Sequence, residues 1–221
     1  ALDKTKQARL DKLNSYNAKV SYEQADVTNF EAVEKLIKTT KKEYVAINGI
    51  IHSAGVSKDN FLLKKSLEEA QKVINPKILG AVNLDKATKA EKLDIFVVFS
   101  SIAGILGNYG QTDYAYANNF LDAFAAHRNH QKTTKTRFGN TLSINWPFWE
   151  EGGFSLSESD IAQGKEHIGI HPIATNIGLE YFEEFLCSGK SQTIALYGNE
   201  AKIKQYLQQK IVSEKVEKTQ V

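Results

Sequence analysis

Residues 95–126 read IFVVFSSIAGILGNYGQTDYAYANNFLDAFAA, and this stretch decides the fold. The apolar run 95–99 predicts a buried strand. A loop with two serines and two glycines follows, and apolar residues then return at helical spacing. The step from strand end to helix start is where open α/β sheets place their sites, outside the carboxyl ends of the strands. A core strand, turn and helix that only pack together would give the same pattern, because fold and function are separate claims.

Three side chains with proton chemistry stand at the turns of this stretch. Ser101 follows the strand, Tyr114 begins the helix, and Asn118 comes four residues later on the same helix face. A phenol has a pKa near ~10, which a nearby ammonium group lowers. Lys77, within an apolar helical stretch at 73–78, is the candidate cation. Taken singly, Tyr114 also fits a core tyrosine and Lys77 a solvated lysine.

Composition limits the class of protein. The 221 residues include 28 basic and 26 acidic side chains, interspersed, with a formal charge of +2, which argues against an electrostatic nucleic-acid binder. The single Cys187 excludes an internal disulfide and suits a reducing compartment. No apolar run approaches the ~20 residues of a membrane span. We therefore expect a cytoplasmic protein with no membrane, nucleic-acid or metal site. The absence of Met, even at position 1, indicates a piece of a longer chain.

Strand and helix patterns alternate along the chain. This alternation predicts an α/β fold, a Rossmann-like doubly wound parallel sheet. We expect one domain at 1–212 and a frayed charged tail at 213–221. Capping boxes are predicted at Thr28–Glu31 and Ser66–Glu69, and Pro76 should kink or restart the helix that contains it. The other expected elements are helices at 1–19, 28–40, 66–82 and 177–186, strands at 20–25, 45–52, 141–146 and 193–197, and a long loop at 147–172.

The motifs FSSIAG and QTDYAYANNFLDAFAAHR closely resemble the ketoreductase domains of modular polyketide synthases, a branch of the short-chain dehydrogenases/reductases. The resemblance extends over nearly the whole chain. It implies a catalytic set in which Lys77 precedes Ser101 by 24 residues, Tyr114 follows Ser101 by 13, and Asn118 follows Tyr114 by four. The Lys and Asn places are exchanged relative to most short-chain dehydrogenases, as in this branch. Ser101 and Tyr114 would donate to the substrate carbonyl oxygen, and Asn118 would hold Lys77 or a relay water.

The resemblance also implies NADPH as cofactor. Asp26 and Val27 would lie at the adenine, although an exposed acid at a strand end would read the same. The turn His52-Ser53-Ala54-Gly55 stands where the family has a turn beneath the nicotinamide ribose, with His52 itself expected to be structural. Gly55 permits close backbone approach. The remaining positions implied at the cofactor are Ala54, Lys77, Tyr114 and Pro147, of which Pro147 fits a strand-terminating proline equally well.

A glycine-rich phosphate-binding turn is not found among these residues, since no G-x-G-x-x-G occurs. The family has this motif about thirty residues before the position that matches Ala1. The chain therefore resembles the part of a ketoreductase domain that follows its second strand. Either the N-terminal segment lies elsewhere, or the sequence is truncated.

Substrate, partners and stereochemistry follow from the resemblance alone. It implies reduction of a β-ketoacyl thioester on the phosphopantetheine arm of an acyl carrier protein, beside neighbouring synthase domains. Asp59 matches the diagnostic acid of the D-forming type, although a solvated loop acid is the alternative. Leu106 replaces the Trp of the L-forming type. The loop at 147–172 is long enough for a lid whose apolar members Phe148, Trp149, Phe154 and Leu156 would cover an acyl chain, or for a plain surface loop.

Two other functions stay open at this point. A stand-alone short-chain reductase acting on a free ketone would share the catalytic set. A catalytically inactive ketoreductase half that only scaffolds neighbouring domains would share the fold, although loss of the Tyr or Lys would then be expected.

Overall fold

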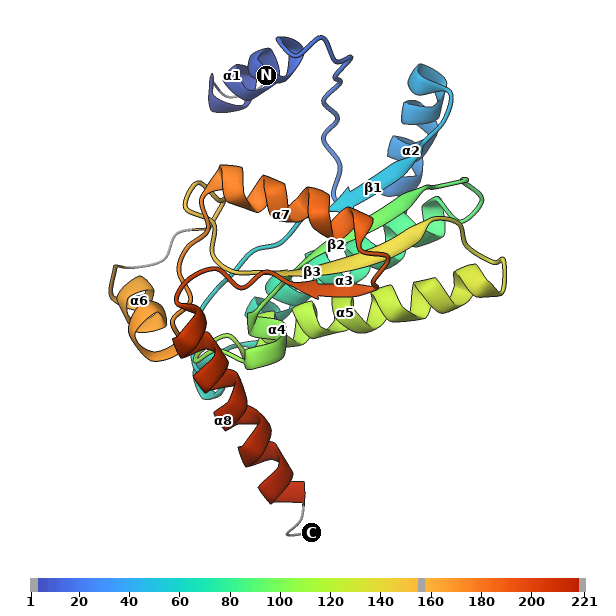
Figure 1. The fold of residues 1–221 in the computed structure, drawn as a ribbon. Coiled ribbons are helices and arrows are strands. Elements are labelled where there is room, and N and C mark those ends of the chain that lie inside the picture. Colours follow the sequence, from blue (N-terminus) through green and yellow to red (C-terminus); the bar gives the residue numbers. More distant parts are fainter. Residues whose placement is uncertain (1–3, 155–157, 219–221) are drawn as a thin grey trace.

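A parallel four-stranded sheet forms the centre of the protein in the computed structural model, which describes residues 4–154 and 158–218 (Figure 1). The strands lie in the order β1-β2-β3-β4. Ser101 pairs with Trp146, and His52 pairs with Val98, so the carboxyl ends of neighbouring strands meet at one edge. The α/β parallel fold predicted from the alternating pattern is confirmed. The strands are β1 (Gly49–His52), β2 (Ile95–Ser101), β3 (Asn140–Trp146) and β4 (Gln192–Ile194).

Helices cover both faces of the sheet. Helices α2 (Phe30–Tyr44), α3 (Leu67–Ala87) and α5 (Thr112–Thr133) contribute to a core cluster with β2, whose members include Phe96 and Val98. Helix α7 (Thr175–Cys187) covers the other face, where Val97 and Ile144 lie in a second cluster. This alternation along β2 is what a strand buried on both faces requires. The shorter elements are α1 (Lys4–Asn14), η1 (Leu62–Lys64), α4 (Ala103–Leu106), α6 (Glu158–Gln163) and η2 (Gly164–Ile168), followed by α8 (Glu200–Lys218).

The strand predicted at 20–25 is wrong, because this segment has no regular secondary structure and pairs with no strand of the described sheet. Within the described chain β1 is an edge of the sheet, and Ile51 on it is 53% exposed. The segment 19–23 instead lines a groove opposite residues 46–49. An alternating sequence becomes a strand only when a neighbouring strand supplies its hydrogen bonds.

The helix starts test the predicted capping boxes. The box at Ser66 and Glu69 is confirmed, with reciprocal side-chain and backbone hydrogen bonds. The box predicted at Thr28 is wrong, because Asn29 caps α2 by accepting from the Ala32 N–H. Pro76 lies inside α3, which is one helix from Leu67 to Ala87 rather than a restarted one.

The C-terminal third contains helices that periodicity did not predict. The loop predicted at 147–172 includes α6 and the π-helix η2. Helix α8 extends to Lys218, so residues 213–218 are helical and not frayed as expected. It projects away from the sheet in Figure 1. No change of secondary structure marks the predicted boundary at 212, which stays a prediction.

Candidate active site

Lys77 lies at the carboxyl edge of the sheet, on α3, and is only 3% exposed. Its Nζ donates to the Phe99 carbonyl oxygen across 2.8 Å and lies 5.6 Å from the centroid of the Tyr114 ring. Gly55 makes room for this side chain, because a Cβ there would stand 3.0 Å from Lys77 Cε. Burial lowers the pKa of Lys77 to about 8, against the opposing charge of Asp122. The ammonium group is therefore close to the phenol ring, and its pKa lies well below the usual range for lysine.

Tyr114 occupies the first turn of α5, as predicted. Burial raises the pKa of its phenol, while hydrogen bonding to the Ser101 and Asn118 side chains lowers it and the charge of Asp59 raises it. The expectation that Lys77 lowers this pKa below its ordinary value is wrong for the structure. The physical reason is burial, because the cost of desolvating the phenolate exceeds what the two side-chain hydrogen bonds recover.

Ser101 and Asn118 complete the group predicted from the sequence. Ser101 ends β2, and its Oγ accepts from the Ala103 N–H at 3.2 Å. Asn118 is fully buried, and its Nδ2 donates to the Tyr114 carbonyl oxygen at 2.8 Å. Its Oδ1 is buried with no hydrogen-bond partner among the described residues. An unpaired buried acceptor is costly, so this oxygen is suited to a donor such as water.

A buried carboxylate behind the site was not predicted. Asp122 lies one turn after Asn118 on α5 and accepts from Ser143 Oγ at 2.6 Å and Asn145 Nδ2 at 2.9 Å. Asn145 Nδ2 also lies 2.9 Å from Ser100 Oγ. The four-residue spacing of Tyr114, Asn118 and Asp122 was the signal that could have identified it.

The predicted cofactor residues divide into two groups. His52 and Val27 meet beside Gly80, where an added Cβ would lie 2.6 Å from His52 Cε1 and 3.2 Å from Val27 Cγ2. His52 Nε2 lies 3.2 Å from the Lys77 carbonyl oxygen, and burial lowers the pKa of His52 to about 4. His52 is thus a neutral residue packed beneath Lys77, consistent with the structural role expected for it.

Asp26 lies on the exposed side of this region. Its Oδ1 accepts from the Thr28 N–H at 2.9 Å and the Thr28 hydroxyl at 2.8 Å, which together lower its pKa. Ala54 is half-buried in the turn that follows β1, and Pro147 is buried directly after β3. These positions fit the edge where a ligand would lie, but their roles at a cofactor remain predictions.

Asp59 is exposed, and its carboxylate accepts hydrogen bonds from two side chains. Its Oδ2 accepts from Gln111 Nε2 at 2.7 Å, and its Oδ1 accepts from the Ser57 hydroxyl. Gln111 precedes Tyr114 by three residues, and the charge of Asp59 acts on the Tyr114 phenol. Leu106 ends α4 and is half-buried.

The predicted lid residues behave differently from one another. Trp149 packs 4.9 Å from Trp146, centroid to centroid, and a Cβ on Gly178 of α7 would lie 2.3 Å from its ring. This packing anchors Trp149 against α7, and its role over an acyl chain stays a prediction. The Phe154 ring lies 6.0 Å from the Tyr114 ring, edge to face. Phe148, whose carbonyl accepts from Ile173 at 2.8 Å, is half-buried, and Leu156 falls outside the described residues.

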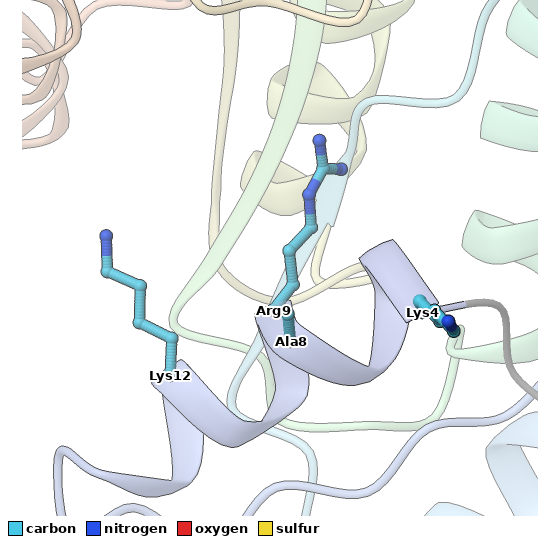
Figure 2. Close-up of a pocket in the computed structure, with 4 residues that line it drawn as sticks. All are labelled: Lys4, Ala8, Arg9 and Lys12. Atoms are coloured by element: carbon cyan, nitrogen blue, oxygen red, sulfur yellow. The ribbon is translucent and has the colours of Figure 1, made fainter.

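Features elsewhere do not offer comparable chemistry. A surface recess on α1 is lined by Lys4, Ala8, Arg9 and Lys12, with Arg9 and Lys12 extending from the same side of the helix (Figure 2). Across residues 4–154 and 158–218, no group of three or more His, Cys, Asp or Glu side chains is arranged for a metal ion. Within the same ranges, no helix combines the length and apolar character that crossing a membrane requires.

Comparison with known proteins identifies the family. A family model described as the KR domain matches residues 1–151. Polyketide synthase PksN of Bacillus subtilis is 42% identical over 216 residues, which is 98% of this chain but 4% of that protein. Polyketide synthase PksL of the same organism is 40% identical over 93% of this chain and 4% of its own length.

Solved structures give the same result. A ketoreductase domain from the bacillaene assembly line superimposes with a TM-score of 0.91 at 43% identity, covering 94% of this chain and 50% of that one. An N-terminal ketoreductase from the macrolactin assembly line gives a TM-score of 0.83 at 36% identity, covering 94% and 40%. The chain spans half or less of these structures and a small part of the synthases. With its Rossmann-like sheet and its Ser, Tyr, Asn and Lys at one edge, it belongs to the ketoreductase domains of polyketide synthases.

Proposed function

We propose that this chain forms the catalytic part of a ketoreductase that reduces a β-ketoacyl thioester to a β-hydroxyacyl thioester in polyketide biosynthesis. One observation carries the proposal. Lys77, Ser101, Tyr114 and Asn118 come from three different elements and gather at the carboxyl edge of the sheet, with Lys77 buried 5.6 Å from the Tyr114 ring. A buried lysine costs stability, so its position against a tyrosine needs a functional reason.

The side chains divide the work on the ketone. Ser101 and Tyr114 direct two hydroxyl donors at the oxygen that becomes charged. Tyr114 then donates its proton to that oxygen, and its raised pKa keeps the phenol protonated at neutral pH. Lys77 stabilises the phenolate that remains. Asn118 Oδ1, which is buried and has no hydrogen-bond partner within the described part of the chain, would accept from a water that returns a proton. NADPH, when bound, supplies hydride to the ketone carbon.

The residues fit the nicotinamide end of such a cofactor. The turn at 53–55 and Lys77 pack against each other, and Tyr114 lies beside them. The pyrophosphate would need a glycine-rich turn on a helix N-terminus, which this sequence does not contain. We propose that a segment outside these 221 residues supplies that turn and the contacts that select NADPH over NADH.

The substrate would be delivered on the phosphopantetheine arm of an acyl carrier protein, from neighbouring domains of the same synthase. Phe154, edge to face with the Tyr114 ring, supports a cover over the bound acyl chain. Asp59, held by Gln111 on one side of Tyr114, supports access from one direction and a D-configured hydroxyl product.

The test is NADPH oxidation with a β-ketoacyl thioester, using this chain joined to the segment that holds the glycine-rich turn. We expect turnover by the natural sequence, loss of turnover in Tyr114→Phe, and unchanged turnover in Tyr116→Phe. Tyr116 is a matched control because it lies two residues away and is exposed. A natural sequence that does not oxidise NADPH with this substrate would contradict the proposal and favour a scaffolding role.

A further inference from the structure

A buried ion pair joins the loop after β1 to the start of α5. Lys65 Nζ donates to both carboxylate oxygens of Asp113 at 2.7 Å, and the two side chains are only 3% and 4% exposed. Asp113 Oδ1 also accepts from the N–H of Tyr114 at 2.9 Å. The pair therefore holds the backbone of the residue next to it, which is the proposed proton donor.

Two further contacts attach the same loop to the same segment. The Asn60 N–H donates to the Gly110 carbonyl at 2.9 Å, and Gln111 Nε2 donates to Asp59 at 2.7 Å. Residues 59–65 are thus fastened to residues 110–113 at three points, of which the ion pair is the buried one. Loops of this kind otherwise move on functional timescales, so these contacts decide where Asp59 stands relative to Tyr114.

The energetics of buried ion pairs indicate that this pair contributes geometry more than stability. A buried ion pair has desolvation costs that offset much of its attraction, and apolar residues of similar volume often stabilise a fold equally well. Its two short bonds instead define one geometry, as buried polar groups do where they specify a register. The pair does not touch the phenol oxygen or the proposed ketone position, so it would act through its neighbours.

We propose that Lys65 and Asp113 are positioning residues for the reductase site. Their ion pair fixes the first turn of α5, and with it Tyr114, against the loop that holds Asp59. It thereby sets both the rate of proton donation and the side from which the substrate approaches. This inference rests on the proposed function.

The experiment compares variants of the ketoreductase that includes the glycine-rich segment. In Lys65→Met we expect kcat to fall by on the order of tenfold or more, with a smaller change in KM and a larger share of L product. Lys65→Arg, which keeps the charge, should recover most of both. Lys64→Met is the matched control, because Lys64 is the exposed neighbour, and it should change neither value.

Two further measurements keep the test decisive. The double variant Lys65→Met/Asp113→Leu leaves no unpaired buried charge, so it should fold while still losing stereoselectivity. A double variant with the natural kcat and product ratio would overturn the inference. Amide hydrogen exchange of residues 57–65 and 108–114 gives a readout that does not need turnover: faster exchange in the double variant is expected, and unchanged exchange would overturn the inference. A natural sequence without reductase activity would count against the proposed function instead.

Discussion

The ammonium nitrogen of Lys77 lies 5.6 Å from the centroid of the Tyr114 ring but donates its hydrogen bond to the Phe99 carbonyl. The cation is therefore near the phenol without being bonded to it in this structure. The negative charge of Asp122 raises the pKa of Lys77, and burial lowers it by a larger amount. The proton chemistry of the site thus depends on how α3, β2 and α5 are held together.

Tyr114→Phe should abolish reduction while leaving the fold intact, because only the hydroxyl is removed. General-acid groups contribute roughly 10²- to 10⁴-fold to rate, so turnover should fall by at least that much. NADPH oxidation measures the rate, and circular dichroism checks the fold. Turnover within a few-fold of the natural sequence would remove Tyr114 from the role of proton donor.

Lys77→Met should change how stability depends on pH. The lysine pKa falls from 10.5 to about 8 on folding, so the unfolded chain binds this proton more tightly between those values. Raising the pH from 8 towards 10.5 removes the proton from buried Lys77 in the folded protein. The free energy of unfolding of the natural protein should therefore rise by up to about 3 kcal/mol from this group. The methionine variant should lack this gain.

Urea unfolding at pH 8 and pH 10 measures the difference. Staying at or below pH 10 limits the contribution of Tyr114, whose pKa is raised. An identical pH dependence of stability in the two proteins would mean that burial does not lower the pKa of Lys77. In the assembled enzyme the same variant should lower the rate, because the phenolate left after proton donation loses its nearby ammonium group.

Asp122→Asn should lower the pKa of Lys77 further, because it removes the opposing charge. It also breaks the pattern in which Asp122 accepts from Ser143 and Asn145, at an expected cost of about 1–3 kcal/mol. The rise in stability with pH should then begin below pH 8. The exposed Asp94→Asn is the control. If the rise begins at the same pH in both variants, Asp122 does not act on Lys77.

Much of the fold followed from local sequence. The apolar runs of β2 and β3 and the Ser66 capping box are determined by neighbouring residues, and they were predicted correctly. The segment at 20–25 was not, because strand formation depends on a partner that sequence periodicity does not report. Helix α8 was missed because its exposed part has little amphipathic pattern, and pattern was the signal used.

The site residues were predicted from the resemblance to ketoreductases, which gives the residues but not their environment. The resemblance put Lys77 and Tyr114 in one site, yet the direction of the Tyr114 pKa shift depends on burial. Trp149 looked like a lid residue, but its contact with Gly178 exists only once α7 has packed. Such facts depend on tertiary contacts between residues distant in sequence.

The last prediction concerns the configuration of the product. The Asp59 carboxylate accepts hydrogen bonds from Gln111, three residues before Tyr114, and from the Ser57 hydroxyl, and its charge acts on the phenol. A fixed charge there should admit the carrier arm from the other side only. We expect a predominantly D-hydroxyacyl product, with a lower D share in Asp59→Ala and no change in the exposed neighbour Lys58→Ala. Chiral chromatography of the product measures the ratio. A predominantly L product from the natural sequence would refute the role of Asp59. It would leave ketone reduction itself unaffected, because Tyr114 donates its proton to the oxygen whichever face of the ketone receives the hydride.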